Sequence, residues 1–135
     1  MRDAIRRLAE GLPDVVRRPC WGEEGFFHRP PGSTRRLGRL FLTIRDDPAR
    51  GEGGVRYSVA LPPPLYAAWF GPPPARPRRR EAFESGRRHG PFRPHPVYAW
   101  AGWAQAVDPG PGDAEALARA VREAYGRAVE RGDAR

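Results

Sequence analysis

The sequence has 135 residues, a formal net charge of +8 and one cysteine. This length fits a single domain, and no apolar run approaches the length needed to cross a bilayer. One cysteine excludes an internal disulfide and a cysteine-based zinc site. The first residues show no apolar signal region, so we expect a cytoplasmic protein without a membrane partner.

The positive charge comes entirely from arginine, because the chain contains 24 basic residues and no lysine. Such a surplus indicates a partner that carries phosphates, with nucleic acid as the leading candidate. The alternative is a coding bias in which arginine stands wherever another genome would use lysine. Composition alone leaves both interpretations open.

The first half of the chain predicts a helix followed by strands. Residues 3–11 form the helix, because Ile5 and Leu8 fall at helical spacing. Residues 15–28 form short extended pieces, with a turn or bulge at the glycines. Residues 40–45 form a strand by length and composition, and residues 55–61 alternate cleanly between apolar and small or polar side chains.

Two loops concentrate the arginines. Residues 29–39 end in a basic cluster, and residues 72–93 are rich in proline, arginine and glycine, which predicts a mobile loop. A Gly-rich segment at residues 50–54 lies between two strands and lacks a phosphate-loop ending, so we interpret it as a hairpin loop. The arginines that would contact nucleic acid are Arg35, Arg36, Arg39, Arg78, Arg79 and Arg80.

The second half predicts two helices around one aromatic strand. Residues 65–70 fit a short helix that begins after a proline run and ends at a glycine. Residues 94–107 are expected to form the last strand of the sheet, with His95 held between two prolines at its start. Residues 113–129 show the apolar stripe of an amphipathic helix that covers a sheet.

Several blocks of the chain resemble a family of small bacterial proteins of unknown function. The matching residues are Trp21-Gly22 with Phe26-Phe27, Phe41-Leu42-Thr43-Ile44, Gly54-Val55-Arg56, and the closing block Pro94-His95-Pro96-Val97-Tyr98 with Gly102-Trp103. The resemblance spans almost the whole chain. The chain departs from it at Ser58 and Asp108, where we expect asparagine, and in the long basic loop.

More distantly, the chain is similar to the MmcQ/YjbR-like proteins, through Trp103, the acidic turn at Asp113 and Tyr125 in the last helix. That resemblance implies an α+β fold with an antiparallel sheet flanked by helices, and by analogy a double-wing shape that binds DNA. The order of the predicted elements indicates the same class. We therefore expect one α+β domain over residues 1–135, with an N-terminal and a C-terminal helix against the sheet.

Three functions remain open from the sequence. The first is a non-catalytic binding or interaction module, with an unidentified small molecule or a second copy of the chain as partner and a groove formed by Trp21, Arg56, Trp69, His95 and Trp103. The second is nucleic-acid binding through the six arginines named above. The third is an enzyme, which requires a carboxylate such as Glu24 or Asp46 within hydrogen-bond reach of His95. We find no cofactor loop and no metal-ligand spacing, so we expect neither group.

Overall fold

A six-stranded antiparallel sheet is the centre of the fold, with strand order β1-β2-β3-β4-β6-β5. The computed structural model describes residues 1–46, 54–79 and 81–131. The strands are β1 (Val15–Cys20), β2 (Glu23–His28), β3 (Arg39–Asp46), β4 (Val55–Ala60), β5 (Phe92–Pro94) and β6 (Trp103–Val107). The helices are α1 (Arg2–Gly11), α2 (Pro63–Phe70) and α3 (Ala114–Arg131), with short 3-10 helices η2 (Ala99–Ala101) and η3 (Pro111–Asp113). The predicted α+β class, with a helix near each end of the chain, is confirmed.

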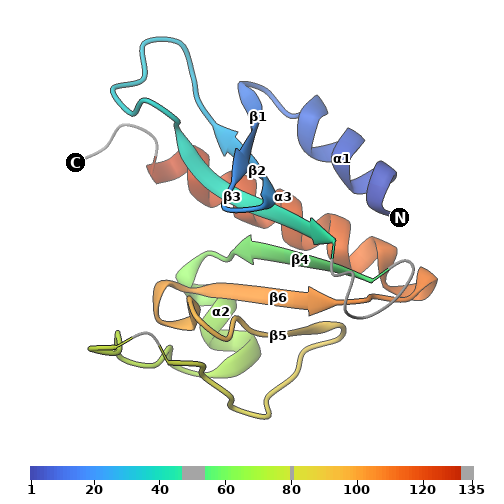
Figure 1. Cartoon of the computed structure of the whole chain (residues 1–135), viewed down its shortest axis with the longest axis vertical. Coiled ribbons are helices and arrows are strands. Elements are labelled where there is room, and N and C mark those ends of the chain that lie inside the picture. The colour runs from blue at the N-terminus through green and yellow to red at the C-terminus, as the bar shows by residue number, and fades with distance from the viewer. Residues whose placement is uncertain (47–53, 80, 132–135) are drawn as a thin grey trace.

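The α-helices lie behind the sheet in Figure 1 and leave its other face open. α3 packs across β3 and β4, while α1 packs on β1 and on α3. α2 adds Tyr66 and Phe70 to the same core. The alternation in β4 explains this division, because Tyr57 and Val59 are fully buried in the core under the helices while the residue between them, Ser58, faces the opposite side.

A bulge in β3 changes which of its side chains reach the open face. Phe26 pairs with Leu42, but the next residue, Phe27, pairs with Leu40, so Phe41 has no partner across the ladder. An extra residue of this kind resets the alternation of the strand. Phe41 turns to the helices, where its ring meets Tyr125 edge-on at 5.6 Å between centroids. Leu40 and Thr43, three residues apart, consequently both lie on the open face.

The predicted strand over residues 94–107 is wrong, because the structure splits it into two strands joined by a turn. Only residues 92–94 and 103–107 form strands, and these two pair with each other. The chain turns at His95, whose Nδ1 accepts hydrogen bonds from the backbone N–H groups of Val97 (3.0 Å) and Tyr98 (3.1 Å). Gly102 ends the turn with φ +84°, a left-handed conformation that glycine adopts without strain.

The structure describes only part of the β3–β4 connection and nearly all of the α2–β5 connection. Most of the Gly-rich segment interpreted as a hairpin loop lies outside the described residues, and the strands on either side of it pair antiparallel. In the other connection, between α2 and β5, the N–H of Phe83 donates to the carbonyl of Pro96 at 2.6 Å. The mobility expected for residues 72–93 stays a prediction. Within the described parts of the chain, no helix is long and apolar enough to cross a membrane.

Candidate ligand-binding pocket on the open sheet face

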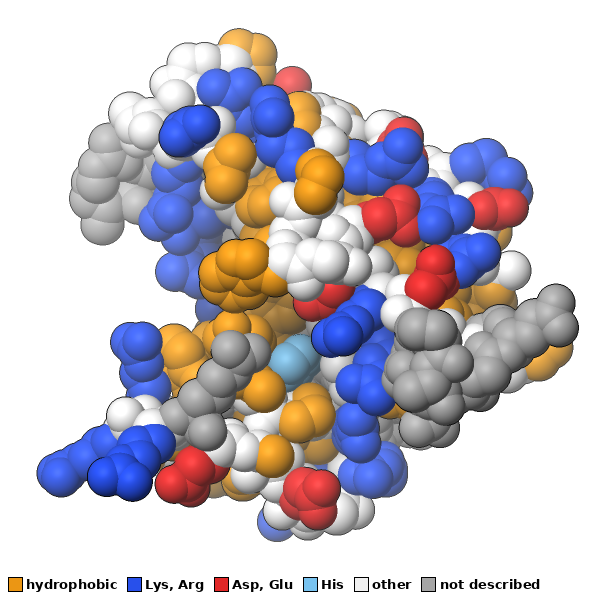
Figure 2. Space-filling model, viewed as in Figure 1, with side chains coloured by type: hydrophobic (Ala, Val, Ile, Leu, Met, Phe, Trp, Pro, Cys, Tyr) orange, Lys and Arg blue, Asp and Glu red, His pale blue; other side chains and the backbone are white. Residues whose placement is uncertain are grey.

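The open face of the sheet carries a pocket of about 210 Å³. It lies over β3, β4 and β6 and is closed at its sides by the β1–β2 turn and by the turn between β5 and β6. Figure 2 shows this face, with a pale-blue histidine in a hollow between orange hydrophobic side chains and a run of blue arginines. The lining residues are Cys20, Trp21, Glu23, Leu40, Thr43, Ser58, His95, Tyr98 and Trp103.

Trp21 forms the most exposed wall of the pocket. It occupies a two-residue turn with Gly22 between β1 and β2, and both residues have positive φ, +49° and +81°. Turns of this type prefer asparagine or glycine at the first position, because a bulky side chain is strained there. The side chain is also 83% exposed. A strained, solvent-exposed tryptophan beside a pocket is costly for the fold and is typical of a binding residue.

The floor of the pocket is made of hydroxyl groups. Thr43 and Ser58 are direct partners across β3 and β4, and both are almost completely buried. Thr43 Oγ1 donates to Glu23 Oε1 at 3.1 Å, and Ser58 Oγ accepts from Gln105 Nε2 at 3.3 Å. Each hydroxyl therefore has a protein partner, as buried polar groups require, and still keeps hydrogen-bonding capacity for a ligand.

His95 presents a hydrogen-bond donor to the pocket. Burial, and then the positive charges of Arg93 and Arg56, lower the pKa of His95 to about 4. The ring is therefore neutral near pH 7 and carries one proton. Because Nδ1 accepts the two backbone hydrogen bonds of the turn, the proton resides on Nε2. His95 is consequently a donor, and its Nε2 cannot act as a general base.

Cys20 lines the pocket as a protonated thiol. Burial raises the pKa of Cys20, and the negative charge of Glu23 raises it further. A thiolate is the reactive form of cysteine. The environment therefore disfavours nucleophilic chemistry at this residue.

Two carboxylates considered as partners of His95 in an enzyme, Glu24 and Asp46, pair with arginines of α1. Glu24 forms an ion pair with Arg6, with Oε2 accepting from Nη2 at 2.5 Å. Asp46 forms an ion pair with Arg2. Within the described ranges, no group of three His, Cys, Asp or Glu side chains could hold a metal ion. The groups in the pocket can bind and orient a molecule.

The structure brings together three of the five residues predicted to form the groove. Trp21, His95 and Trp103 line the pocket. Arg56 precedes Ser58 by two residues on the open face of β4, and its charge acts on His95. Trp69 lies apart from the pocket, where its ring stacks on His89 at 4.3 Å and on Phe92 at 5.3 Å.

Sequence reasoning missed most of the polar and apolar lining. Thr43 and Ser58 are single small residues inside strands, and only the pairing of β3 with β4 places them side by side. Leu40 reaches the pocket through the bulge. The alternation of β4 does predict the face on which Ser58 lies, but it does not predict a pocket there. The remaining missed residues are Cys20, Glu23 and Tyr98.

The residues expected to be asparagine by family resemblance have defined roles in this chain. Ser58 belongs to the pocket floor. Asp108 follows β6 with φ +46°, its Oδ1 accepts from the N–H of Val55 at 2.7 Å, and its own N–H donates to the carbonyl of Val55 at 2.9 Å. Asp108 thus holds the beginning of β4 against the end of β6 and lies outside the pocket lining.

The predicted nucleic-acid contacts fall into two separate groups. Arg35 and Arg36 lie in the β2–β3 connection and Arg39 begins β3, whereas Arg78 and Arg79 lie in the α2–β5 connection. In Figure 1 these two connections lie at opposite ends of the long axis of the molecule. Arg80 lies outside the described residues.

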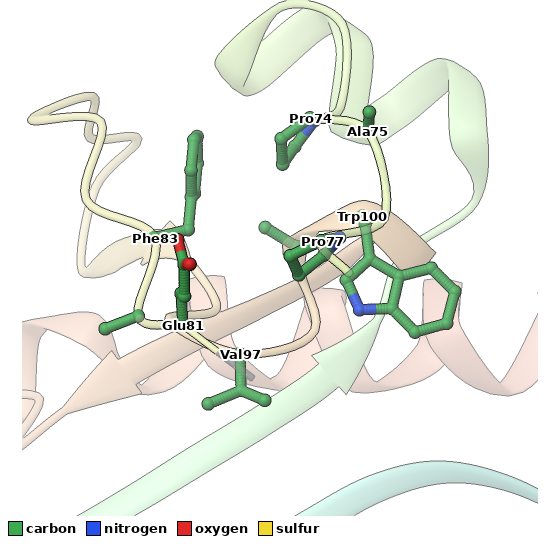
Figure 3. Close-up of a pocket in the computed structure, with 9 residues that line it drawn as sticks. Pro74, Ala75, Pro77, Glu81, Phe83, Val97 and Trp100 are labelled. Atoms are coloured by element: carbon green, nitrogen blue, oxygen red, sulfur yellow. The ribbon is translucent and has the colours of Figure 1, made fainter. Parts of the chain in front are cut away.

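A second, smaller hollow of about 100 Å³ lies under the α2–β5 connection. Figure 3 shows Pro77 beside Trp100, with Phe83 on the opposite side. The guanidinium of Arg76 lies 4.5 Å from the centre of the Trp100 ring. Among the described residues that line this hollow, only Glu81 is charged, so the hollow offers fewer groups to orient a ligand than the open-face pocket.

Comparison with known proteins gives one result. No curated protein and no solved structure shows a significant match to the chain. A family model described as "Family of unknown function (DUF6194)" matches residues 1–135. The chain therefore belongs to this family of unknown function.

Proposed function

We propose that the protein is a non-catalytic binding module and that its ligand site is the pocket on the open face of the sheet. The observation that carries this proposal is Trp21, which is held in a left-handed turn and left exposed at the wall of a pocket with a hydrogen-bonding floor. Neither feature stabilises the free protein, so both favour a role in binding.

The lining groups favour a small planar molecule. Trp21, Tyr98 and Trp103 supply aromatic surfaces on which a ring can stack. The Nε2–H of His95 would donate to an acceptor on the ligand, and Glu23 would accept from a ligand donor. The volume of about 210 Å³ is below the roughly 300–1,000 Å³ usual for ligand pockets, so the ligand should be small.

The test is ligand-observed NMR with a library of small aromatic molecules, comparing the wild-type protein with Trp21→Ala. Trp21 is largely exposed, so its removal leaves the fold intact. We expect compounds that bind the wild type to lose about five- to tenfold in affinity, because stacking on an aromatic side chain contributes about 1–1.5 kcal/mol. Trp100→Ala, outside this pocket, is the matched control. Equal binding by Trp21→Ala and wild type, or an effect as large in the control, would contradict the proposed site.

Nucleic-acid binding is the second candidate, and the exposed arginines of the α2–β5 connection favour it. The test is fluorescence anisotropy with labelled duplex and single-stranded DNA across a salt series, with an Arg78/Arg79/Arg80→Ala variant. Binding near physiological salt that weakens in the variant would support this function. Because the two arginine groups lie at opposite ends of the molecule, one short oligonucleotide should contact only one of them. Loss of DNA binding by roughly 150 mM salt would contradict a nucleic-acid-binding function.

Two finer expectations remain proposals. The distant relation to MmcQ/YjbR-like proteins rests on the shared α+β arrangement and on the residues around Trp103. A homodimer remains open, and sedimentation of the purified protein at several concentrations would decide its oligomeric state.

A further inference from the structure

Two arginines continue the floor of the pocket. Arg45 follows Thr43 by two residues in β3, and Arg56 precedes Ser58 by two residues in β4, so both share the open face with the pocket hydroxyls. Arg45 and Arg56 are direct partners across the two strands. The Arg45–Arg56 rung therefore lies one step, about 7 Å, from the Thr43–Ser58 rung.

Like charges directly opposite each other in a sheet repel, so this rung presents a concentrated positive charge to the open face. Two described carboxylates nearby, Asp46 and Glu24, pair with arginines of α1. Glu23 is turned toward Thr43, to which it is hydrogen-bonded. Arg45 is exposed and forms no ion pair with any residue in the ranges 1–46, 54–79 and 81–131.

Further positive groups lie on the same side of the pocket. Arg93 Nη2 donates to Gln105 Oε1 at 2.8 Å, and Gln105 Nε2 in turn donates to Ser58. This chain of hydrogen bonds fixes the guanidinium of Arg93 relative to the pocket floor. The charges of Arg56 and Arg93 both reach His95, as their effect on its pKa shows. An anion held here would also meet the Nε2–H of His95.

We propose that the ligand of this pocket is a planar anion, whose ring lies between Trp21 and Trp103 and whose carboxylate or phosphate binds the Arg45–Arg56 rung. This inference rests on the proposed function, and it adds the charge and the chemical class of the ligand. Arginine suits either group, because its planar fork donates two parallel hydrogen bonds to a carboxylate or a phosphate.

The experiment uses two pairs of probes that differ in charge and share a ring. Indole-3-acetate is compared with indole-3-acetamide, and adenosine monophosphate with adenosine, by calorimetry and ligand-observed NMR at low salt. We expect the anion of at least one pair to bind about tenfold or more tightly than its neutral partner. The pair that shows the preference distinguishes a carboxylate from a phosphate ligand. In Arg45→Gln/Arg56→Gln the anion should fall to the affinity of the neutral probe, which should itself be unchanged.

The controls separate this inference from the proposed function. Arg119→Gln/Arg122→Gln removes the same charge from exposed positions of α3, on the covered side, and should keep the preference for the anion. The single variant Arg45→Gln, at an exposed residue, replaces the double variant if the latter does not fold. Neutral and anionic probes that bind the wild type equally well would overturn the anionic ligand and leave the pocket as a binding site. Failure of all four probes to bind would count against both.

Discussion

The two faces of the sheet are formed by alternate residues of the same strands, and their side chains differ in chemistry. On the covered face, Tyr57 and Val59 are buried under the helices. On the open face, the intervening Ser58 pairs with Thr43, and one step away Arg45 opposes Arg56. The hydroxyls are nearly as buried as the core, although no helix covers them. Burial on the open face therefore comes from the pocket walls, and this face contains polar and charged groups that are absent from the apolar core.

The largest effect is expected on the covered face. Leu42→Ala removes a fully buried side chain from the core, and we expect the free energy of unfolding to fall by about 2–5 kcal/mol. Leu37→Ala is the matched control, because Leu37 is 46% exposed in a connection, and it should stay within about 0.5 kcal/mol of the wild type. Urea denaturation measures both. Comparable losses in the two variants would mean that Leu42 does not belong to a tightly packed core.

The open face should respond to pH through His95. Its folded-state pKa of about 4 lies below the ordinary 6.5, so between these values the unfolded chain binds more protons than the folded protein. The contribution of neutral His95 to the free energy of unfolding is therefore fully present above about pH 6.5. It is lost as the pH falls toward 4, and the loss amounts to up to about 3 kcal/mol. Urea denaturation at pH 7, 5.5 and 4.5 measures it.

His95→Asn isolates this contribution from the titrating carboxylates. The asparagine side-chain oxygen can accept the same turn hydrogen bonds from Val97 and Tyr98, and it does not titrate. The variant should therefore lose less stability than the wild type between pH 6.5 and 4. An identical pH dependence in the two proteins would show that His95 is not held neutral by its surroundings.

Reciprocal isosteric swaps test the two faces against each other. Val59→Thr places a hydroxyl in the covered core, and we expect a loss of about 1–3 kcal/mol, because the group has no partner there. Thr43→Val removes the hydroxyl that donates to Glu23 at the pocket floor, and the loss should be about 1 kcal/mol or less. Denaturation midpoints compare the two variants. A loss from Thr43→Val as large as that from Val59→Thr would assign the pocket hydroxyls to the fold.

The sequence predicts this division of faces better than it predicts the pocket. The alternation over residues 55–61 assigns Tyr57 and Ser58 to opposite sides, because a strand has a period of two. It does not reveal the bulge at Phe41, since residues 40–42 are all large and apolar and no register shows in them. The sequence also does not reveal where Trp69 packs, because its ring stacks on His89 and Phe92, which lie about 20 residues further along the chain and show no pattern that links them to Trp69. The sequence pattern does not predict the turn at His95 either, because the turn depends on two hydrogen bonds that the imidazole Nδ1 accepts from the backbone.

The smallest effect on stability is expected at Trp21, and its sign is the opposite of the others. Trp21→Asn places a residue that tolerates positive φ beside Gly22, forming the Asn-Gly sequence that two-residue turns prefer. We expect the free energy of unfolding to rise by up to about 1 kcal/mol, as strain in the left-handed conformation is relieved. Binding of the small aromatic probes should weaken in the same variant.

Trp21→Ala, which lacks the aromatic ring but keeps the strained turn, should weaken binding without the gain in stability. A stabilised variant that still binds as well as the wild type would show that the exposed tryptophan contributes to neither the fold nor the pocket, and the search for a ligand site would have to leave the open face.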